Sequence, residues 1–298
     1  MKRLFINKYP FKLNDYKKFD KENRKVFLIE DQNCDDMLEL FFKRILNVIK
    51  EKKHFPIIRL ADGEYQFLLG SNELNFRKPK IKLVYHIFKQ YYEKLFNKRF
   101  EAKSKTYTSG RYDIKKSKID IIKKYSISLQ NISKKGILAI YTIIKPGFYS
   151  EQYLPKLEQF FQKNKININI ENYVPFYFVY ILLTNKRYRA VYENKNVHLI
   201  TSFNQKSKIK IEKTLKSFNV KEITWTRISE DNSLYDLIET KKINKNVDVV
   251  FVGGGLGKVN IFNQLDNFPA LIIDAGYIFE TWKEPILVKE RNYCQSHD

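Results

Sequence analysis

The chain has 298 residues, of which 43% are hydrophobic and 15% aromatic, and this composition excludes a predominantly disordered protein. Its 55 Lys and Arg against 33 Asp and Glu give a formal net charge of +22, which favours anionic partners such as phosphorylated substrates, lipid headgroups or nucleic acid. The basic residues are scattered along a chain also rich in Asn, Ile, Phe and Tyr, as an AT-rich genome produces, so the charge by itself does not choose among these partners.

The first part of the sequence alternates helix and strand signals. Residues 1–34 lack clear periodicity, and we expect a lead-in packed on a single domain over 35–298. Apolar spacing predicts a helix from Asp35 to Lys53 with Asp35 as its N-cap. Short buried strands are predicted over 56–60 and 136–141, with helices over 81–96, 118–129 and 150–162 and a Pro146-Gly147 turn. The aromatic run 173–189 fits either a helix or a strand.

The second half repeats the strand–helix unit more clearly. Strands are predicted over 196–201, 220–225, 247–252 and 270–273, with helices over 207–218 and 233–243 and another after the glycines at 253–255. This alternation predicts an α/β fold with a Rossmann-like, doubly wound, mostly parallel sheet flanked by helices. Ligands of such sheets bind at the carboxyl ends of the strands. The informative loops are therefore those that follow Leu60, Thr201, Trp225, Val252 and Ile273.

The loop after Leu60 carries two carboxylates, Asp62 and Glu64, on either side of Gly63. Carboxylates at this spacing are suited to a hard divalent cation, which in turn neutralises a diphosphate. Gly63 allows a sharp turn between them. The alternative is an ordinary turn, since Asp-Gly is one of the commonest turn dipeptides.

Three glycines, Gly253, Gly254 and Gly255, follow the strand over 247–252. Bare backbone at a strand-to-helix junction favours contact with a phosphate or a ribose. The spacing matches neither a P-loop, because Val259 stands where Ser or Thr is required, nor a dinucleotide fingerprint, because Lys258 occupies the third glycine position. A tight turn for helix packing is the alternative explanation.

Polar residues also follow the strands over 220–225 and 270–273. Asn232 and Ser233 either cap the predicted helix or hydrogen-bond a base or a ribose. Asp274 and Tyr277 follow the last strand, with Glu280 just beyond, and each of them has a structural cap as its alternative role. The four histidines form no recognisable metal or nucleophile motif, so covalent catalysis through Ser or Cys is poorly supported.

Taken in order, these loops resemble the bacterial GT-D-fold glycosyltransferases, a family marked by an Asp-x-Glu motif near the N-terminus. The matching stretches are residues 58–64, 227–235, 249–259 and 272–282. The region from about 75 to 195 is not matched. Two positions depart from the family pattern: Gly254-Gly255-Leu256 stands where members often have a Gly-Pro-Thr-like loop, and Tyr277 stands where they often have His.

The resemblance implies transfer of a sugar from a nucleotide-diphosphate donor, with Mn²⁺ or Mg²⁺ as the usual cofactor. Asp62 and Glu64 would then serve the metal, the diphosphate or the sugar, and Glu64 and Glu280 are the candidate catalytic bases. The remaining expected donor-binding residues are Arg59, Gly63, Asn232, Ser233, Gly253, Gly254, Gly255, Asp274 and Tyr277. Tyr277 can donate a hydrogen bond but is a poor base near neutral pH.

The leading hypothesis is therefore a glycosyltransferase of polysaccharide biosynthesis that acts on a cell-surface glycan, glycolipid or glycoprotein acceptor. Two alternatives stay open: another group transferase, of the phosphoryl type, acting on a surface glycan, and a non-enzymatic polyanion-binding protein. No specific nucleic-acid partner is expected, because the corresponding motifs are absent from the sequence. Cys34 and Cys294 form no disulfide framework, and no apolar run approaches ~20 residues. We therefore expect a soluble, cytoplasmic protein with a peripheral contact to the inner face of the membrane.

Overall fold

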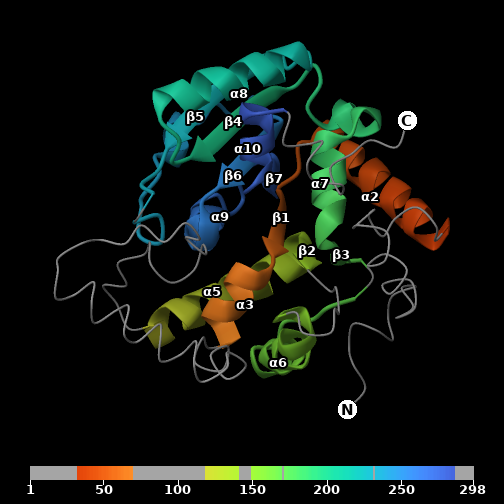
Figure 1. Cartoon of the computed structure of the whole chain (residues 1–298), viewed down its shortest axis with the longest axis vertical. Coiled ribbons are helices and arrows are strands. Elements are labelled where there is room, and N and C mark those ends of the chain that lie inside the picture. Colours follow the sequence, from red (N-terminus) through yellow and green to blue (C-terminus); the bar gives the residue numbers. More distant parts are fainter. Residues whose placement is uncertain (1–31, 70–117, 141–148, 170, 231, 286–298) are drawn as a thin grey trace, which may run out of the picture.

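The computed structural model describes residues 32–69, 118–140, 149–169, 171–230 and 232–285 (Figure 1). The predicted lead-in up to residue 31, the predicted helix over 81–96 and the Pro146-Gly147 turn lie outside these ranges. In the described part, a seven-stranded sheet has the order β3-β2-β1-β7-β6-β4-β5, and every neighbouring pair is parallel. The predicted Rossmann-like α/β fold with an open, parallel sheet is confirmed.

The strands are β1 Phe55–Leu60, β2 Ile137–Ile140, β3 Tyr173–Pro175, β4 Asn196–Thr201, β5 Glu222–Arg227, β6 Val249–Gly253 and β7 Leu271–Asp274. The α-helices of the described residues are α2 Gln32–Glu51, α3 Asp62–Leu69, α5 Lys118–Lys135, α6 Tyr149–Lys163, α7 Phe176–Thr184, α8 Gln205–Ser217, α9 Lys258–Gln264 and α10 Ile278–Lys283. Shorter 3₁₀ turns are η2 Lys186–Val191, η3 Thr240–Lys242 and η4 Gly255–Gly257.

The direction of each crossover decides which face of the sheet its helix covers. The connections β1→β2 and β6→β7 run one way along the sheet, whereas β3→β4 and β4→β5 run the other way. Because such crossovers are right-handed, the two groups of helices fall on opposite faces. Accordingly α5 contacts α9 on one face, and α10 contacts α7 and α8 on the other. The connections that leave β4 and β6 diverge, so the topological switch point lies between these two neighbouring strands.

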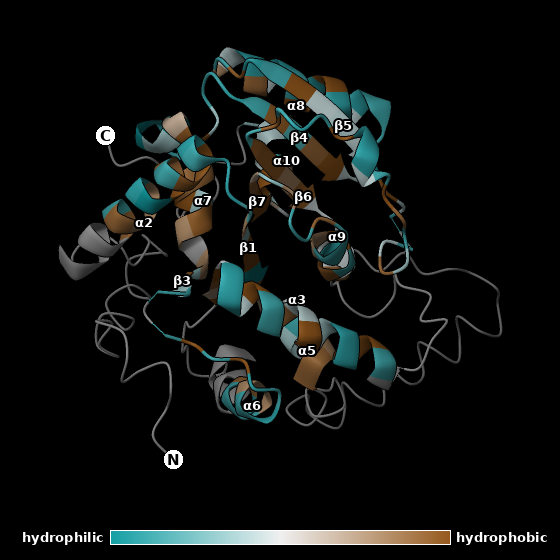
Figure 2. Ribbon diagram, turned by 180° about the vertical axis from the view of Figure 1, so that it is seen from behind, coloured by the Kyte–Doolittle hydropathy of each residue, from teal (hydrophilic) through white to brown (hydrophobic). Residues whose placement is uncertain are grey.

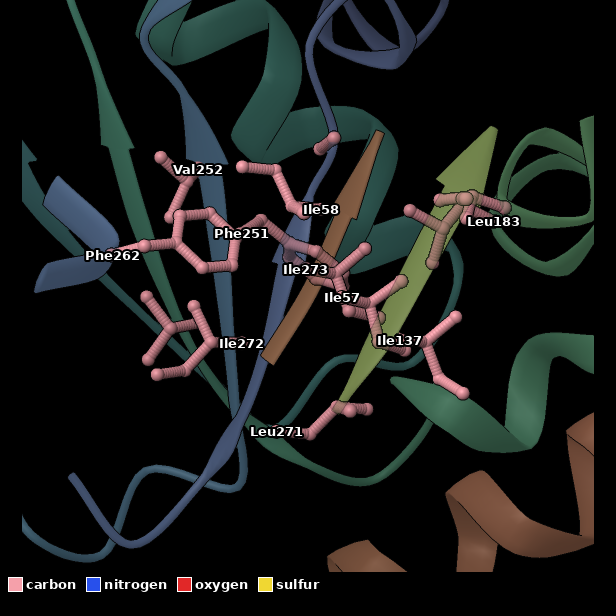
Figure 3. Close-up of a cluster of buried hydrophobic side chains, with 14 of the residues drawn as sticks. Ile57, Ile58, Ile137, Leu183, Phe251, Val252, Phe262, Leu271, Ile272 and Ile273 are labelled. Carbon is pink, nitrogen blue, oxygen red and sulfur yellow. The ribbon is translucent and has the colours of Figure 1, made fainter. Parts of the chain in front are cut away.

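The core is a continuous apolar layer on both sides of the central strands. All the strand residues of β1 and β7 are buried, as are the first four of β6, which is expected of a parallel sheet covered by helices on both faces. Figure 3 shows side chains from β1, β2, β6 and β7 packed together, with Phe262 of α9 and Leu183 of α7 among them. The hydropathy colouring of Figure 2 shows β6 and β7 as apolar. This layer fixes the strand ends on which the candidate site is built.

Several predicted element boundaries need correction. Asp35 is not an N-cap, because α2 begins at Gln32 and includes it. The predicted strand over 220–225 is shifted, and β5 runs from Glu222 to Arg227. The run 173–189, for which the sequence leaves helix and strand open, contains both: strand β3 is followed by helix α7, and the run ends within the 3₁₀ turn η2.

The predicted helix over 233–243 is wrong: this stretch is irregular except for the short 3₁₀ turn η3. Two amide side chains of α9 supply the physical reason. Asn260 Nδ2 donates to the carbonyls of Ser233 (3.1 Å) and Asp236 (2.8 Å), and Gln264 Nε2 also donates to the Asp236 carbonyl (2.7 Å). The Ile238 amide donates to Gln264 Oε1 at 2.8 Å. These bonds use backbone groups that an α-helix would pair internally.

Candidate functional site

The residues of the predicted metal motif form the first turn of a helix rather than a free turn. Asp62, Gly63 and Glu64 are the first three residues of α3, directly after β1 and Ala61. The Ala61 amide donates to Glu64 Oε2 at 2.9 Å, so Glu64 reaches back to the residue before the helix in the manner of a capping box. This bond satisfies an amide that the helix leaves unpaired, and it explains why a helix starts at an Asp-Gly pair.

Glu64 also enters a buried charge cluster whose centre is Lys258. The Nζ atom of Lys258 lies 2.7 Å from Glu64 Oε1, 2.7 Å from Asp274 Oδ2 and 2.5 Å from the carbonyl oxygen of Arg59. An ammonium group has three N–H donors, and all three are used here. Lys258, the first residue of α9, therefore ties together the ends of β1 and β7 and the first turn of α3.

Arg59 completes this cluster from the other side of Asp274. Its backbone amide donates to Asp274 Oδ2 at 3.1 Å, and its Nη2 lies 3.4 Å from Asp274 Oδ1. The guanidinium carbon lies 5.1 Å from the ring centre of Phe176 and 4.6 Å from that of Tyr180, which are cation–π distances. The side chain is only 4% exposed, and its Nε and Nη1 have no hydrogen-bond partner in the part of the chain that the structure describes. Two buried nitrogens of Arg59, which carry three N–H donors, thus have no acceptor among the described residues.

The four ionisable groups of this charge cluster (Arg59, Glu64, Lys258 and Asp274) balance to zero formal charge. For Arg59, Lys258 and Asp274, burial disfavours the charged form, but the neighbouring interactions outweigh this effect. The pKa of Asp274, which burial would raise, is lowered by the neighbouring Lys258 and Arg59. Burial would also lower the pKa of Lys258, yet Asp274 and Glu64 raise it. Burial would likewise lower the pKa of Arg59, but its interactions with Tyr180 and Asp274 raise that pKa instead. Arg59, Lys258 and Asp274 therefore stay ionised at neutral pH.

Gly276 is required by the geometry of this charge cluster. Its φ of +43° lies in the left-handed region, and an added Cβ would stand 2.1 Å from Arg59 Nη2 and 3.2 Å from Asp274 Oδ1. The Asp274-Ala275-Gly276 sequence therefore brings the backbone close to the guanidinium. The sequence pattern after the last strand assigns no role to Gly276, and this close approach to Arg59 gives it one.

The three glycines at the carboxyl end of β6, Gly253 to Gly255, have different roles. An added Cβ on Gly253 would lie 2.6 Å from the Phe279 ring, and one on Gly254 would lie 3.1 Å from the Lys258 amide, so packing accounts for these two. Gly255 is exposed and has a φ of +52°. The loop sits at the switch point, because Gly253 pairs in register with Thr201 at the end of β4. This is the place where an open α/β sheet binds its ligand.

The loop after β5 packs beneath this glycine loop. Ser233, which is 1% exposed, donates its hydroxyl to the Gly254 carbonyl at 3.1 Å, and an added Cβ on Gly257 would overlap Ser233. Asn232 is half-buried, and its backbone amide donates to Ser229 Oγ at 3.0 Å. Ser233 therefore supports the glycine loop, and it caps no helix because no helix forms there.

The last two candidates lie just after β7. Tyr277 is half-buried and immediately precedes α10. Glu280, on α10, is half-buried and forms an ion pair with Lys283 of the same helix. The structure thus brings together Arg59, Glu64 and Asp274 through Lys258, whereas the partner of Glu280 lies within α10.

Sequence reasoning missed three of the residues that organise this edge. Lys258 was seen only as the wrong residue for a glycine motif, and Asn260 and Gln264 were not considered. The signal for Lys258 was its position beside Leu256, Val259 and Ile261, since a cation within an apolar run must be buried with partners. Nothing local marks the two amides, because their acceptors lie more than 20 residues away along the chain.

Among the described residues, no group of three or more His, Cys, Asp or Glu side chains is arranged to hold a metal ion. Nucleotide-bound Mg²⁺ commonly takes only one or two carboxylates, because phosphates and waters supply its other ligands. Asp62 and Glu64 fit that smaller donor set by type, although each oxygen of Glu64 already accepts a bond from the protein. No helix in the described ranges is long and apolar enough to cross a membrane.

The fold and this edge define an open, all-parallel Rossmann-like α/β protein with a buried charge cluster at its strand ends. No family model matches the sequence, and no curated protein matches it. One similar solved structure is described as a selenomethionine-substituted domain of unknown function 1792. It is 14% identical to this chain, with a TM-score of 0.47, and the match covers 84% of each chain.

Proposed function

We propose that this protein is a nucleotide-sugar-dependent glycosyltransferase whose donor binds at the carboxyl ends of β1, β7, β6 and β4. The observation that carries the proposal is the convergence of separate sequence motifs on one edge. The start of α3, the glycine loop and the Asp274 loop come from three adjacent strands, and Lys258 joins them. The resemblance of these same motifs to GT-D-fold glycosyltransferases supports sugar transfer as the reaction.

In this proposal, the exposed Gly255 and the neighbouring switch point between β4 and β6 receive the nucleotide. Arg59, whose Nε and Nη1 have no acceptor among the described residues, is suited to an anionic oxygen of the donor. Asp62, at the start of α3, holds the Mn²⁺ or Mg²⁺ that neutralises the diphosphate. Glu64 orients that turn through its bonds to Ala61 and Lys258.

The division of labour between the two carboxylates follows from the contacts of Glu64. A general base needs a carboxylate oxygen that can reach the substrate proton, and both oxygens of Glu64 already accept bonds, from Lys258 Nζ at 2.7 Å and from the Ala61 amide at 2.9 Å. Glu64 is therefore better suited to positioning than to proton transfer. Glu280 also pairs with an ammonium group, that of Lys283, but its side chain is more exposed than that of Glu64 (27% against 10%), so it is the better placed of the two to activate an acceptor hydroxyl.

A thermal-shift screen tests the proposal. The wild-type protein, Asp62→Ala and the control Asp120→Ala, which removes an exposed carboxylate from α5, are each mixed with UDP-, GDP- and CMP-sugars with and without Mn²⁺. We expect one nucleotide class to stabilise the wild type and the control in the presence of metal, and Asp62→Ala to lose this response. Stabilisation of Asp62→Ala equal to the wild type, or no response to any donor, contradicts the proposal.

The same screen separates the alternatives. A phosphoryl-type transferase responds to a nucleotide without discriminating among its sugars. A polyanion-binding protein responds to heparin or RNA in a salt-sensitive manner, irrespective of Asp62. Product analysis with the responding donor then distinguishes transfer to a glycan or lipid-linked acceptor from simple hydrolysis.

A further inference from the structure

The outward face of helix α8 carries four exposed lysines and no acidic residue of its own. The exposed residues of α8 are Gln205, Lys206, Ile209, Lys210, Lys213, Lys216 and Ser217. At 100° per residue, the four lysines and Ile209 fall within an arc of about 120°. Over ten residues the arc extends roughly 15 Å along the helix. Figure 1 places α8 at the outside of the molecule, beyond β4 and β5.

The one acidic residue of α8 is directed away from this face. Glu212 is half-buried, accepts the indole N–H of Trp225 at 2.7 Å and lies 3.8 Å from Lys208. It therefore belongs to the flank that packs on β5. On the outward side, only Lys210 has a described acidic neighbour, the exposed Glu284 at 3.8 Å. The lysine arc is accordingly neutralised very little by its own protein.

The helix is held firmly on the fold. Asn204 caps its first turn by accepting the Ser207 amide at 3.0 Å, and Thr214 donates its hydroxyl to the Trp282 carbonyl at 2.7 Å. Ile211 and Leu215 are fully buried beneath it. The arc is thus a fixed surface, which needs no folding step to meet a partner.

Ile209 distinguishes among anionic partners. Its side chain is 57% exposed and lies between the lysines of the arc. A nucleic-acid backbone offers nothing to an exposed aliphatic group, whereas the interfacial zone of a bilayer takes up apolar side chains flanked by Lys. Clusters of four or more lysines on such a helix are attracted to the negative surface of anionic lipids.

We propose that the outward face of α8 docks this protein on an anionic lipid bilayer. The four lysines contact headgroup phosphates, and Ile209 inserts among the headgroups. Since α8 begins directly after the carboxyl end of β4, its N-terminal end lies at the same sheet edge as the candidate site. The inference does not depend on the proposed function, because binding to vesicles requires neither a donor nor an acceptor.

The test is co-sedimentation of the full chain with two kinds of vesicle at physiological salt. One kind is pure phosphatidylcholine, and the other contains about a third phosphatidylglycerol. The variant Lys206→Gln/Lys210→Gln/Lys213→Gln/Lys216→Gln removes the arc. The control Lys50→Gln/Lys123→Gln/Lys124→Gln/Lys134→Gln removes the same charge from exposed positions on α2 and α5. Helix α5 lies on the opposite face of the sheet and has the exposed Asp120 in its own row.

Each lysine near an anionic surface contributes about fivefold to binding, so loss of the arc should weaken binding to the anionic vesicles by at least about tenfold. The control should lose less than about threefold. Ile209→Asn should weaken vesicle binding by about fivefold while leaving elution from heparin unchanged. Equal loss in the control variant means that net charge alone acts, and this overturns the proposal. The proposal is likewise overturned if the arc variant binds anionic vesicles as tightly as the wild type, or if it loses heparin binding while its vesicle binding stays intact.

Discussion

Replacing Lys258 by Met tests whether the buried ammonium group holds the strand ends together. Methionine keeps most of the length and apolar surface of the lysine stem but removes the three N–H donors of Nζ. Two carboxylates, those of Glu64 and Asp274, then remain buried, with side-chain exposures of 10% and 3%. Their remaining cation is Arg59, whose Nη2 lies 3.4 Å from Asp274 Oδ1.

Removing one partner from a buried ion pair typically costs about 3–5 kcal/mol, since the other charge is left without compensation. At roughly 2 °C per kcal/mol for a chain of this size, the melting temperature should fall by about 6–10 °C. Differential scanning calorimetry or circular dichroism measures this shift. The control Lys213→Met removes an exposed lysine and should change the melting temperature by less than about 1 °C.

The pH dependence of this deficit identifies its cause. In the wild type, Lys258 keeps the pKa of Asp274 low, so the carboxylate is charged and compensated. Without Lys258, burial raises that pKa, and lowering the pH protonates the carboxyl group and relieves the penalty. The gap between the wild type and Lys258→Met should therefore narrow from pH 7.5 to pH 5. Asp274→Asn introduced into Lys258→Met should likewise recover part of the lost stability at pH 7.5.

The reasoning would be refuted by a melting-temperature shift no larger than that of Lys213→Met. A deficit that is the same at pH 5 and pH 7.5, and that Asp274→Asn does not reduce, would also contradict it. In that case the loss would reflect packing of the lysine stem rather than the uncompensated charges.

Three further predictions concern single positions. Gly276→Ala should destabilise the protein by more than about 2 kcal/mol in urea unfolding, because the added Cβ would lie 2.1 Å from Arg59 Nη2. The control Gly255→Ala, at an exposed position, should cost only about 1–2 kcal/mol, the strain of an alanine at positive φ. Ser233→Ala removes the hydroxyl that donates to the Gly254 carbonyl, so the free energy of unfolding should decrease by about 1–2 kcal/mol. Amides of the glycine loop should also exchange with solvent faster, and unchanged hydrogen exchange would contradict the supporting role of Ser233. Burial lowers the pKa of His198 to about 4, so between about pH 6.5 and 4 the unfolded chain binds a proton that the folded chain does not. As the pH falls through that window, the free energy of unfolding should decrease by up to about 3 kcal/mol. His198→Gln should flatten this slope in unfolding measured at pH 7.5 and 5, and an unchanged slope would count against it.

The sequence by itself determined the sheet and the edge at which the candidate site lies. Runs such as 247–252 are apolar at nearly every position, as strands covered on both faces must be, and their alternation with helical segments implies parallel order. The five informative loops follow five strands that turn out to be consecutive, β1-β7-β6-β4-β5. Asp62, Glu64 and Asp274 could thus be placed at one edge from strand ends alone. Where local patterns misled, as over 233–243, the competing hydrogen bonds came from residues distant in the chain.

Only the tertiary structure decided what these residues contact. The Glu64 carboxylate appeared in the sequence as a metal ligand or base, yet it caps α3 and pairs with Lys258, a residue 194 positions later by number (258 − 64). Lys258 looked like a flaw in a glycine motif, and its three bonds became visible only when β1, β6 and β7 were side by side. Local periodicity records burial and backbone conformation, because both depend on near neighbours. Charge pairing across strands depends on which ends meet, and the fold alone sets that.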